Sequence, residues 1–123
     1  MCVRVFLADD AEVVRKAIQR LLSGREDIVG EASNIRETIQ KTAELHPDLI
    51  ILDVTMPEKD CIAPTKVKGL LNGAKILAIT LGADDISEEM LHGVGAVKLL
   101  DKMDLYDQLI PTILELAPER AAL

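Results

Sequence analysis

The chain has 123 residues and a formal net charge of −7, and 49% of its residues are hydrophobic although only 2% are aromatic. This length fits one domain with an aliphatic core, and the hydrophobic content excludes a disordered chain. The acidic charge and the lack of aromatic rings argue against direct nucleic-acid binding, which needs basic patches or stacking surfaces.

Nothing in the sequence suggests an oxidising compartment or a membrane. Cys2 and Cys61 form neither a disulfide framework nor a CxxC metal motif. The apolar run at residues 3–8 is too short for a signal peptide or a membrane span. We therefore expect a cytoplasmic protein with no membrane association.

Short apolar runs recur along the chain and predict five strands. The third and fourth runs are almost wholly apolar, which is typical of strands buried on both faces. The second run is more polar and the fifth is short. The predicted strands lie at residues 3–8, 27–32, 48–53, 74–80 and 97–100.

Between these runs, apolar residues recur at helical spacing and predict five helices. Asn34 and Asp85 are each followed three residues later by a glutamate, as in capping boxes, and Gly93 and Gly95 are expected to end the helix that Asp85 begins. The predicted helices span 13–22, 35–43, a short segment after residue 60, 85–91, and a last segment that begins at Asp104 and contains Pro111.

Strict alternation of strands and helices requires a parallel sheet with helices on both faces. The two driest strands belong in its centre, and the polar second strand and the short fifth strand belong at its edges. This predicts an α/β, doubly wound, five-stranded parallel sheet of order 2-1-3-4-5, as in flavodoxin-like folds. We expect one domain over residues 1–117 and a frayed C-terminal tail at 118–123.

Polar residues follow four of the five strands. Asp9 and Asp10 follow the first strand, Asp53 the third, Thr80 the fourth, and Lys102 the fifth. Ligands of open parallel sheets bind outside the carboxyl ends of the strands, so these side chains are expected to converge. Three close carboxylates repel one another, and a divalent cation with hard oxygen ligands, Mg²⁺, removes that conflict.

Each of these residues also has an ordinary structural role. Asp9 and Glu12 have the spacing of a capping box, and Asp53 could be a turn residue. Thr80 could simply end a β-strand, and Lys102 could be a solvated surface lysine. One shared site explains their places at consecutive strand ends better than four separate coincidences.

Four short motifs at these strand ends match one known family. They are Asp9-Asp10, Asp53-Val54-Thr55-Met56-Pro57 as D-x-x-M-P, Thr80 at a Thr/Ser position, and Gly95-Ala96 with Lys102 as G-A-x5-K. The chain resembles the response-regulator receiver domains of two-component signalling over essentially its whole length. Residues 7–10 and 30–32 are most similar to receivers attached to a C-terminal DNA-binding helix-turn-helix, and we expect no such domain within these 123 residues.

The resemblance implies a phosphoryl acceptor that uses Mg²⁺. Asp53 would be the acceptor, a carboxylate nucleophile that also ligates the metal. Asp10 would bind Mg²⁺ directly, Asp9 mainly through water, and the backbone carbonyl of Thr55 would be the third protein ligand. Mg²⁺ would shield the incoming phosphoryl oxygens.

The resemblance also implies a switch and a set of partners. Lys102 would hold a phosphoryl oxygen as a point charge, and Thr80 would hydrogen-bond the phosphoryl group and transmit the change. The donor would be a histidine kinase or a phosphotransfer protein, and the output would be transcription regulation. A homodimer would form through the fourth helix, fifth strand and fifth helix. Such a domain assists its own phosphorylation and dephosphorylation but is not a conventional enzyme.

Several residues depart from the family pattern. Cys61 stands where the family often has glycine, and Lys98 replaces another common glycine. Met103 follows the lysine where proline is common, so we expect a trans peptide bond there. Leu81 is larger than the usual residue after the threonine, and Leu99 takes the place of the aromatic switch residue. These departures leave the phosphate chemistry intact and predict an altered readout.

Three other functions compete with this one. A receiver-like interaction module that works without phosphorylation is favoured by Leu81 and Leu99. A flavodoxin-like cofactor binder would need a phosphate-cradling loop after the first strand, where the acidic residues 9–12 would repel phosphate. An aspartyl phosphohydrolase usually has a D-x-D motif, and residues 53–55 lack its second acid.

Overall fold

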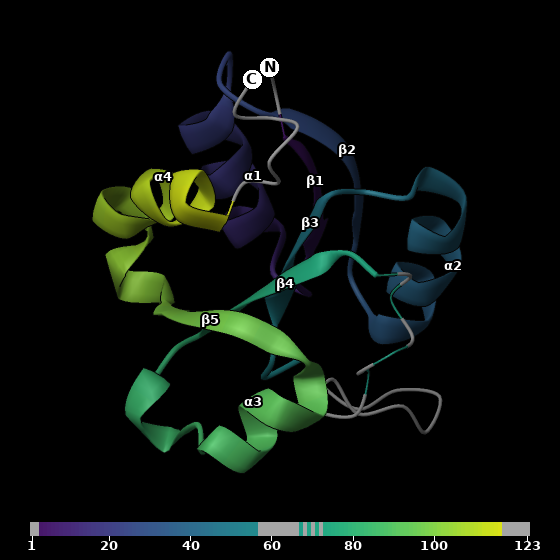
Figure 1. Cartoon of the computed structure of the whole chain (residues 1–123). Coiled ribbons are helices and arrows are strands. Elements are labelled where there is room, and N and C mark those ends of the chain that lie inside the picture. Colours follow the sequence, from purple (N-terminus) through teal and green to yellow (C-terminus); the bar gives the residue numbers. More distant parts are fainter. Residues whose placement is uncertain (1–2, 57–66, 68, 70, 72, 117–123) are drawn as a thin grey trace.

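The structure is a computed structural model that describes residues 3–56, 67, 69, 71 and 73–116. A five-stranded sheet of order β2-β1-β3-β4-β5 runs through its middle (Figure 1). All neighbouring strands pair in parallel. The predicted fold class and strand order are therefore confirmed. The strands are β1 (Arg4–Ala8), β2 (Asp27–Ala32), β3 (Leu49–Asp53), β4 (Lys75–Thr80) and β5 (Ala96–Asp101).

Helices cover both faces of the sheet, and alternate strand residues point to each face. In β1, Val5 and Leu7 belong to the core shared with α1 and α4, whereas Phe6 and Ala8 belong to the core shared with α2 and α3. The helices are α1 (Glu12–Leu22), α2 (Ile35–Leu45), α3 (Glu88–Val94) and α4 (Leu105–Leu116). The helix expected after residue 60, Cys61 and the 118–123 tail lie outside the described residues.

One glycine sets how closely α2 approaches the sheet. A Cβ atom at Gly30 of β2 would lie 2.8 Å from Leu45 Cδ1 and 3.0 Å from Phe6 Cε2. A larger residue would therefore force the side chains of Leu45 and Phe6 to shift. This close packing explains the glycine of the 30–32 triplet.

Side-chain caps begin α2 and α3, and one of the two is the predicted residue. The Asn34 side chain accepts from Glu37 N at 2.8 Å, which confirms the cap of α2. The cap of α3 was placed wrongly, because Ser87 Oγ accepts from Met90 N at 3.1 Å and Asp85 lies in a preceding 3-10 turn. Gly95, with a φ of 76°, ends α3 alone.

The chain between β5 and α4 also differs from the prediction. Strand β5 continues to Asp101, and a 3-10 turn at Lys102–Asp104 precedes α4, which begins at Leu105 rather than at Asp104. The prediction missed this turn because its three residues are too few for a periodic pattern. Pro111 lies inside α4 as expected. No described peptide bond is cis, in line with the expectation for Met103.

Candidate functional site

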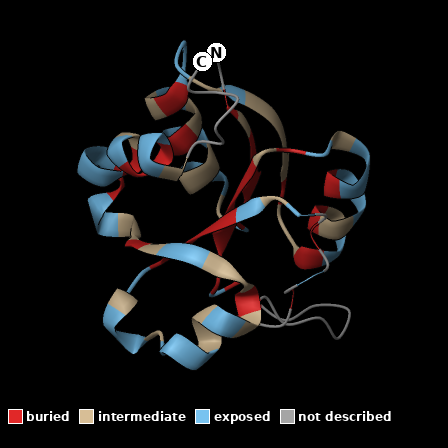
Figure 2. Cartoon of the chain, in the orientation of Figure 1, coloured by how far each residue is buried: buried red, intermediate tan, exposed pale blue. Residues whose placement is uncertain are grey.

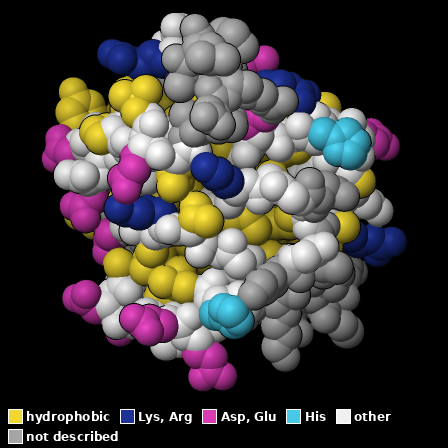
Figure 3. Space-filling view, viewed as in Figure 1, with side chains coloured by type: hydrophobic (Ala, Val, Ile, Leu, Met, Phe, Trp, Pro, Cys, Tyr) yellow, Lys and Arg dark blue, Asp and Glu magenta, His cyan; other side chains and the backbone are white. Residues whose placement is uncertain are grey.

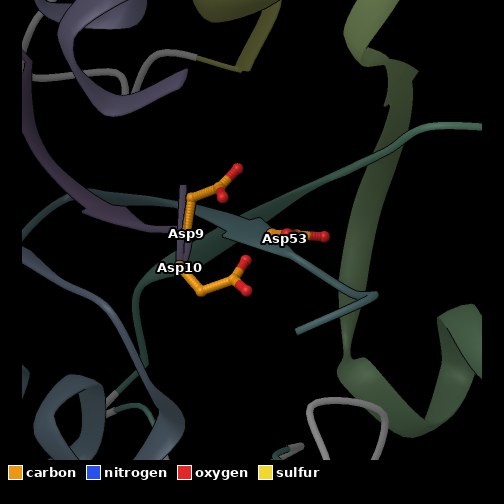
Figure 4. Close-up of side chains that lie close together, drawn as sticks. All are labelled: Asp9, Asp10 and Asp53. Carbon is orange, nitrogen blue, oxygen red and sulfur yellow. The ribbon is translucent and has the colours of Figure 1, made fainter. Parts of the chain in front are cut away.

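Three carboxylates meet at the carboxyl edge of the sheet. Asp9 and Asp10 follow β1 and Asp53 ends β3, and one oxygen from each lies within 4.8 Å of the other two (Figure 4). Asp9 and Asp53 are only 1% and 2% exposed, whereas Asp10 is open to solvent. Adjacent parallel strands place their ends at one edge, so the fold itself forces this concentration of negative charge.

Lys102 neutralises part of this charge. It follows β5 and reaches past β4, so that its Nζ lies 2.8 Å from Asp9 Oδ2 and 3.0 Å from Asp53 Oδ2. Its side chain is only 11% exposed. The alternative that Lys102 is only a solvated surface lysine is therefore wrong.

Asp53 is held through both of its carboxylate oxygens. Oδ2 accepts from Lys102, while Oδ1 accepts from the Thr55 amide at 2.8 Å and from the Thr55 hydroxyl at 2.6 Å. The sequence pointed to Thr55 only through its backbone carbonyl. The amide and hydroxyl contacts are an additional function of this residue, since they fix the orientation of the Asp53 carboxylate.

Thr80 lies at the end of β4 but does not bond to the carboxylates. Its side chain is fully buried, and its hydroxyl donates to the Leu81 carbonyl at 3.2 Å. The Leu81 side chain is 62% exposed. The structure thus brings Lys102 into contact with Asp9 and Asp53, and leaves the Thr80 hydroxyl turned toward its own loop.

Burial and ion pairing act on the titration of this cluster. Burial raises the pKa of Asp9, and the hydrogen bonds from Lys102 and from the Ala11 amide offset this only in part. Burial would lower the pKa of Lys102, but hydrogen bonds to Asp9 and Asp53 outweigh it and raise the pKa. Lys102 is therefore a stable cation at neutral pH, whereas Asp9 ionises at a cost.

The donor set fits a divalent cation. Asp9 Oδ2 is fully buried, and its one partner among the described residues is the Lys102 ammonium at 2.8 Å. Three carboxylates around one ammonium leave a net negative charge. Closely spaced hard oxygens with one solvent-exposed member are ligands that suit Mg²⁺, which retains several waters.

The capping alternative for Asp9 is wrong. The N-cap of α1 is Ala11, which has no side-chain cap, and the Asp9 carboxylate accepts from the Ala11 amide at 2.8 Å before the helix begins. Glu12 instead pairs with Lys16 at 3.0 Å. Asp9 therefore orders the loop after β1 and faces the carboxylate cluster with its other oxygen.

Two residues at the site were missed. Arg15 donates to the Asp9 carbonyl at 2.6 Å. Asp101 accepts from the Gly82, Ala83 and Met103 amides at 3.3, 3.2 and 2.9 Å, and these bonds, that from Met103 foremost, lower its pKa. A cation in the first turn of a helix opposes the helix dipole, and this was the one sequence signal that could have pointed to Arg15.

An apolar groove opens beside Lys102, with a volume of about 570 Å³. Exposed apolar residues on its rim are Val13 of α1, Met103, and Tyr106 of α4. Lys102, which contacts Asp9 and Asp53, also lines this groove.

Comparison of the sequence with known protein families identifies the family of this chain. The family model described as the response regulator receiver domain matches residues 5–113. The chain belongs to this family. This confirms the resemblance that the strand-end motifs indicated.

Individual relatives fall into more than one class of response regulator. The response regulator protein VraR of Staphylococcus aureus is 40% identical over 88 residues, covering 69% of this chain and 42% of VraR. A protein-glutamate methylesterase/protein-glutamine glutaminase of Methanosarcina acetivorans is 36% identical over 109 residues, covering 83% of this chain and 30% of that protein. The chain thus spans less than half the length of these relatives.

Solved structures agree with the fold. A LuxR-family two-component response regulator from Aurantimonas has a TM-score of 0.79 at 26% identity, covering 95% of this chain and 86% of that one. The response regulator domain of Thermotoga maritima CheB, at 21% identity, shows the same fold with a TM-score of 0.78. Among the described residues, no helix is long and apolar enough to span a bilayer.

Proposed function

We propose that this chain is a phospho-accepting receiver, over residues 1–117, that takes a phosphoryl group onto Asp53 with the help of Mg²⁺. The observation that supports this most directly is the Asp53 carboxylate, buried at the end of β3 and oriented through both oxygens by Thr55 and Lys102. A carboxylate fixed in this way loses little freedom when it attacks phosphorus.

The transfer is a substitution at phosphorus. An Asp53 oxygen forms a bond to phosphorus as the bond to the leaving group breaks, and the leaving group departs with the electron pair. Lys102 can shift its Nζ from the Asp53 oxygen to a phosphoryl oxygen while it keeps its contact with Asp9. Thr80 must first release the Leu81 carbonyl before its hydroxyl can donate to the phosphoryl group.

The carboxylates of Asp9, Asp10 and Asp53, with the Thr55 carbonyl, would hold the cation. Bound there, Mg²⁺ would offset the charge of the phosphoryl oxygens next to three carboxylates. Asp10 is the exposed member of the cluster and suits direct ligation, whereas Asp9 already bonds to Ala11 and Lys102 and suits contact through water.

The partners follow from the same role. A histidine kinase or phosphotransfer protein would supply the phosphoryl group in the cytoplasm. The output would be transcription regulation, as the name of the transcriptional regulatory protein LnrK of Bacillus subtilis, 31% identical over 104 residues, suggests. The expected fourth and fifth helices correspond to α3 and α4, and the face of α3, β5 and α4 would carry the signal and any homodimer contact.

Labelling by a small phosphodonor tests the proposal. Wild type treated with phosphoramidate or acetyl phosphate and Mg²⁺ should gain one phosphoryl group, seen by intact mass spectrometry. Asp53→Asn should gain none, because the nucleophile is lost, and the control Asp27→Asn, an exposed acid on β2, should label like wild type. Equal labelling of wild type and Asp53→Asn would overturn the assignment. No labelling of wild type would favour the phosphorylation-independent interaction module.

A further inference from the structure

Arg15 occupies an unfavourable position for a cation. It lies in the first turn of α1, at the positive end of the helix dipole. Its side chain is only 13% exposed and reaches back over the loop after β1. There its Nη1 donates to the Asp9 carbonyl at 2.6 Å and its Nε donates to Glu31 Oε1 at 2.8 Å.

The backbone of Asp9 is consequently fixed at both ends. Its N–H donates to the Ala32 carbonyl of β2 at 3.1 Å, and its carbonyl accepts from Arg15. That carbonyl belongs to the peptide group that joins Asp9 to Asp10. The Asp10 carboxylate is exposed and makes no hydrogen bond or ion pair with the described residues. Its position is therefore determined by the peptide group that Arg15 holds.

We propose that Arg15 is a positioning residue that orients the Asp9–Asp10 peptide and thereby sets the affinity of the carboxylate cluster for a divalent cation. The proposal rests on the proposed function, since it concerns the Mg²⁺ site of the same reaction. It also gives a role to Glu31 of the 30–32 triplet. Glu31 holds Arg15 with one oxygen and is itself held by the Gln19 amide through the other.

The chemistry of the side chain explains why arginine is needed. One planar guanidinium donates in two directions, from Nη1 to the carbonyl and from Nε to the carboxylate. A lysine at this position is a single point charge and cannot hold both acceptors in this fixed geometry. Arg15→Lys therefore removes the positioning while it keeps the net charge of the neighbourhood.

A Mg²⁺ titration followed by amide chemical shifts tests this. Arg15→Lys should weaken Mg²⁺ binding about tenfold, as expected when a partner that orients a ligand is lost. Arg20→Lys is the matched control, because Arg20 is an exposed arginine of the same helix whose side chain has no partner among the described residues, and it should bind Mg²⁺ like wild type. Thermal melts without Mg²⁺ establish that each variant is folded.

A second variant separates positioning from charge. Arg15→Ala combined with Glu31→Ala removes one charge of each sign, and it should weaken binding as much as Arg15→Lys. Equal Mg²⁺ affinity of wild type and both Arg15 variants would overturn the proposal and leave the phospho-acceptor function standing. A wild type that binds no Mg²⁺ would overturn both.

Discussion

The ends of β1 and β3 and the region after β4, which contains α3 and β5, are built differently, although both border the candidate site. Every residue of β3 is buried, and so are Asp9 and Asp53. In contrast, Val94 is the one buried residue of α3, and Val97 on β5 is 54% exposed. Exposed and intermediate residues make up most of both elements (Figure 2). Hydrophobic side chains gather on the surface where β5 meets α3 (Figure 3).

Under the proposed function, this difference separates the region that accepts the phosphoryl group from the region that transmits the change. The carboxylates sit on strands that cannot move without disrupting both core layers, which preserves their geometry. The region after Thr80 has few buried contacts, and such regions open at a low free-energy cost. A phosphoryl group bound at the rigid end can therefore shift the looser one. The following predictions test each side of this contrast, from the largest effect to the smallest.

Replacing Lys102, the cation that pairs with the buried carboxylates of Asp9 and Asp53, should have the largest effect. Lys102→Met leaves Asp9 and Asp53 buried without their partner, so we expect a loss of about 3 kcal/mol in the free energy of unfolding at neutral pH. Urea denaturation measures it, and added Mg²⁺ should restore more stability than in wild type. Lys98→Met, on the strand β5 that precedes Lys102, is the control. Its exposed pair with Glu115 at 3.5 Å should contribute less than about 1 kcal/mol. Equal losses in the two variants would contradict the rigid, buried character of the site.

Neutralising the carboxylate of Asp9 should instead stabilise the folded chain. Because the pKa of Asp9 is raised in the folded chain, ionisation of Asp9 lowers stability at every pH above the usual aspartate range. Asp9→Asn keeps an oxygen for the Ala11 amide and should raise Tm at neutral pH.

The gain from Asp9→Asn should depend on pH. It should fade as the pH falls through the usual aspartate range, where Asp9 is neutral in the folded and unfolded states alike. Thermal melts over a pH series measure this, with Asp27→Asn, at an exposed position on β2, as the control. A less stable Asp9→Asn at neutral pH would show that its bond to Lys102 outweighs the cost of burial.

The region of α3 and β5 should give the smallest effect, a modest change in amide chemical shifts. Leu99 is half-buried against the core layer that contains Phe6 and Val94, and leucine offers less surface than a ring for stabilising two alternative arrangements. A population shift cannot exceed the difference in contact energy between the two states. Beryllofluoride should therefore change amide shifts over residues 84–110 only modestly, and Leu99→Tyr should enlarge the changes. Large, saturated shifts in wild type would disprove this reasoning.

The fold and the convergence of the carboxylates followed from simple rules. Alternating strands and helices dictate a parallel sheet, and the ends of parallel strands share an edge, so Asp9, Asp53 and Lys102 had to approach one another. Their roles in phosphoryl transfer stay predictions. Contacts made by loops could not be foreseen. Asp85 and Ser87 are both residues that cap helices well, and only the three-dimensional path of the chain selects Ser87.

Asp101 links the two segments that leave the site. One of its oxygens accepts from Gly82 and Ala83, which follow Thr80, and the other accepts from Met103, which follows Lys102. Neither segment can be displaced relative to the other without breaking hydrogen bonds to this one carboxylate. In mechanical terms, the loop after β4 and the turn after β5 are coupled and move as one unit. A displacement of either segment therefore moves both.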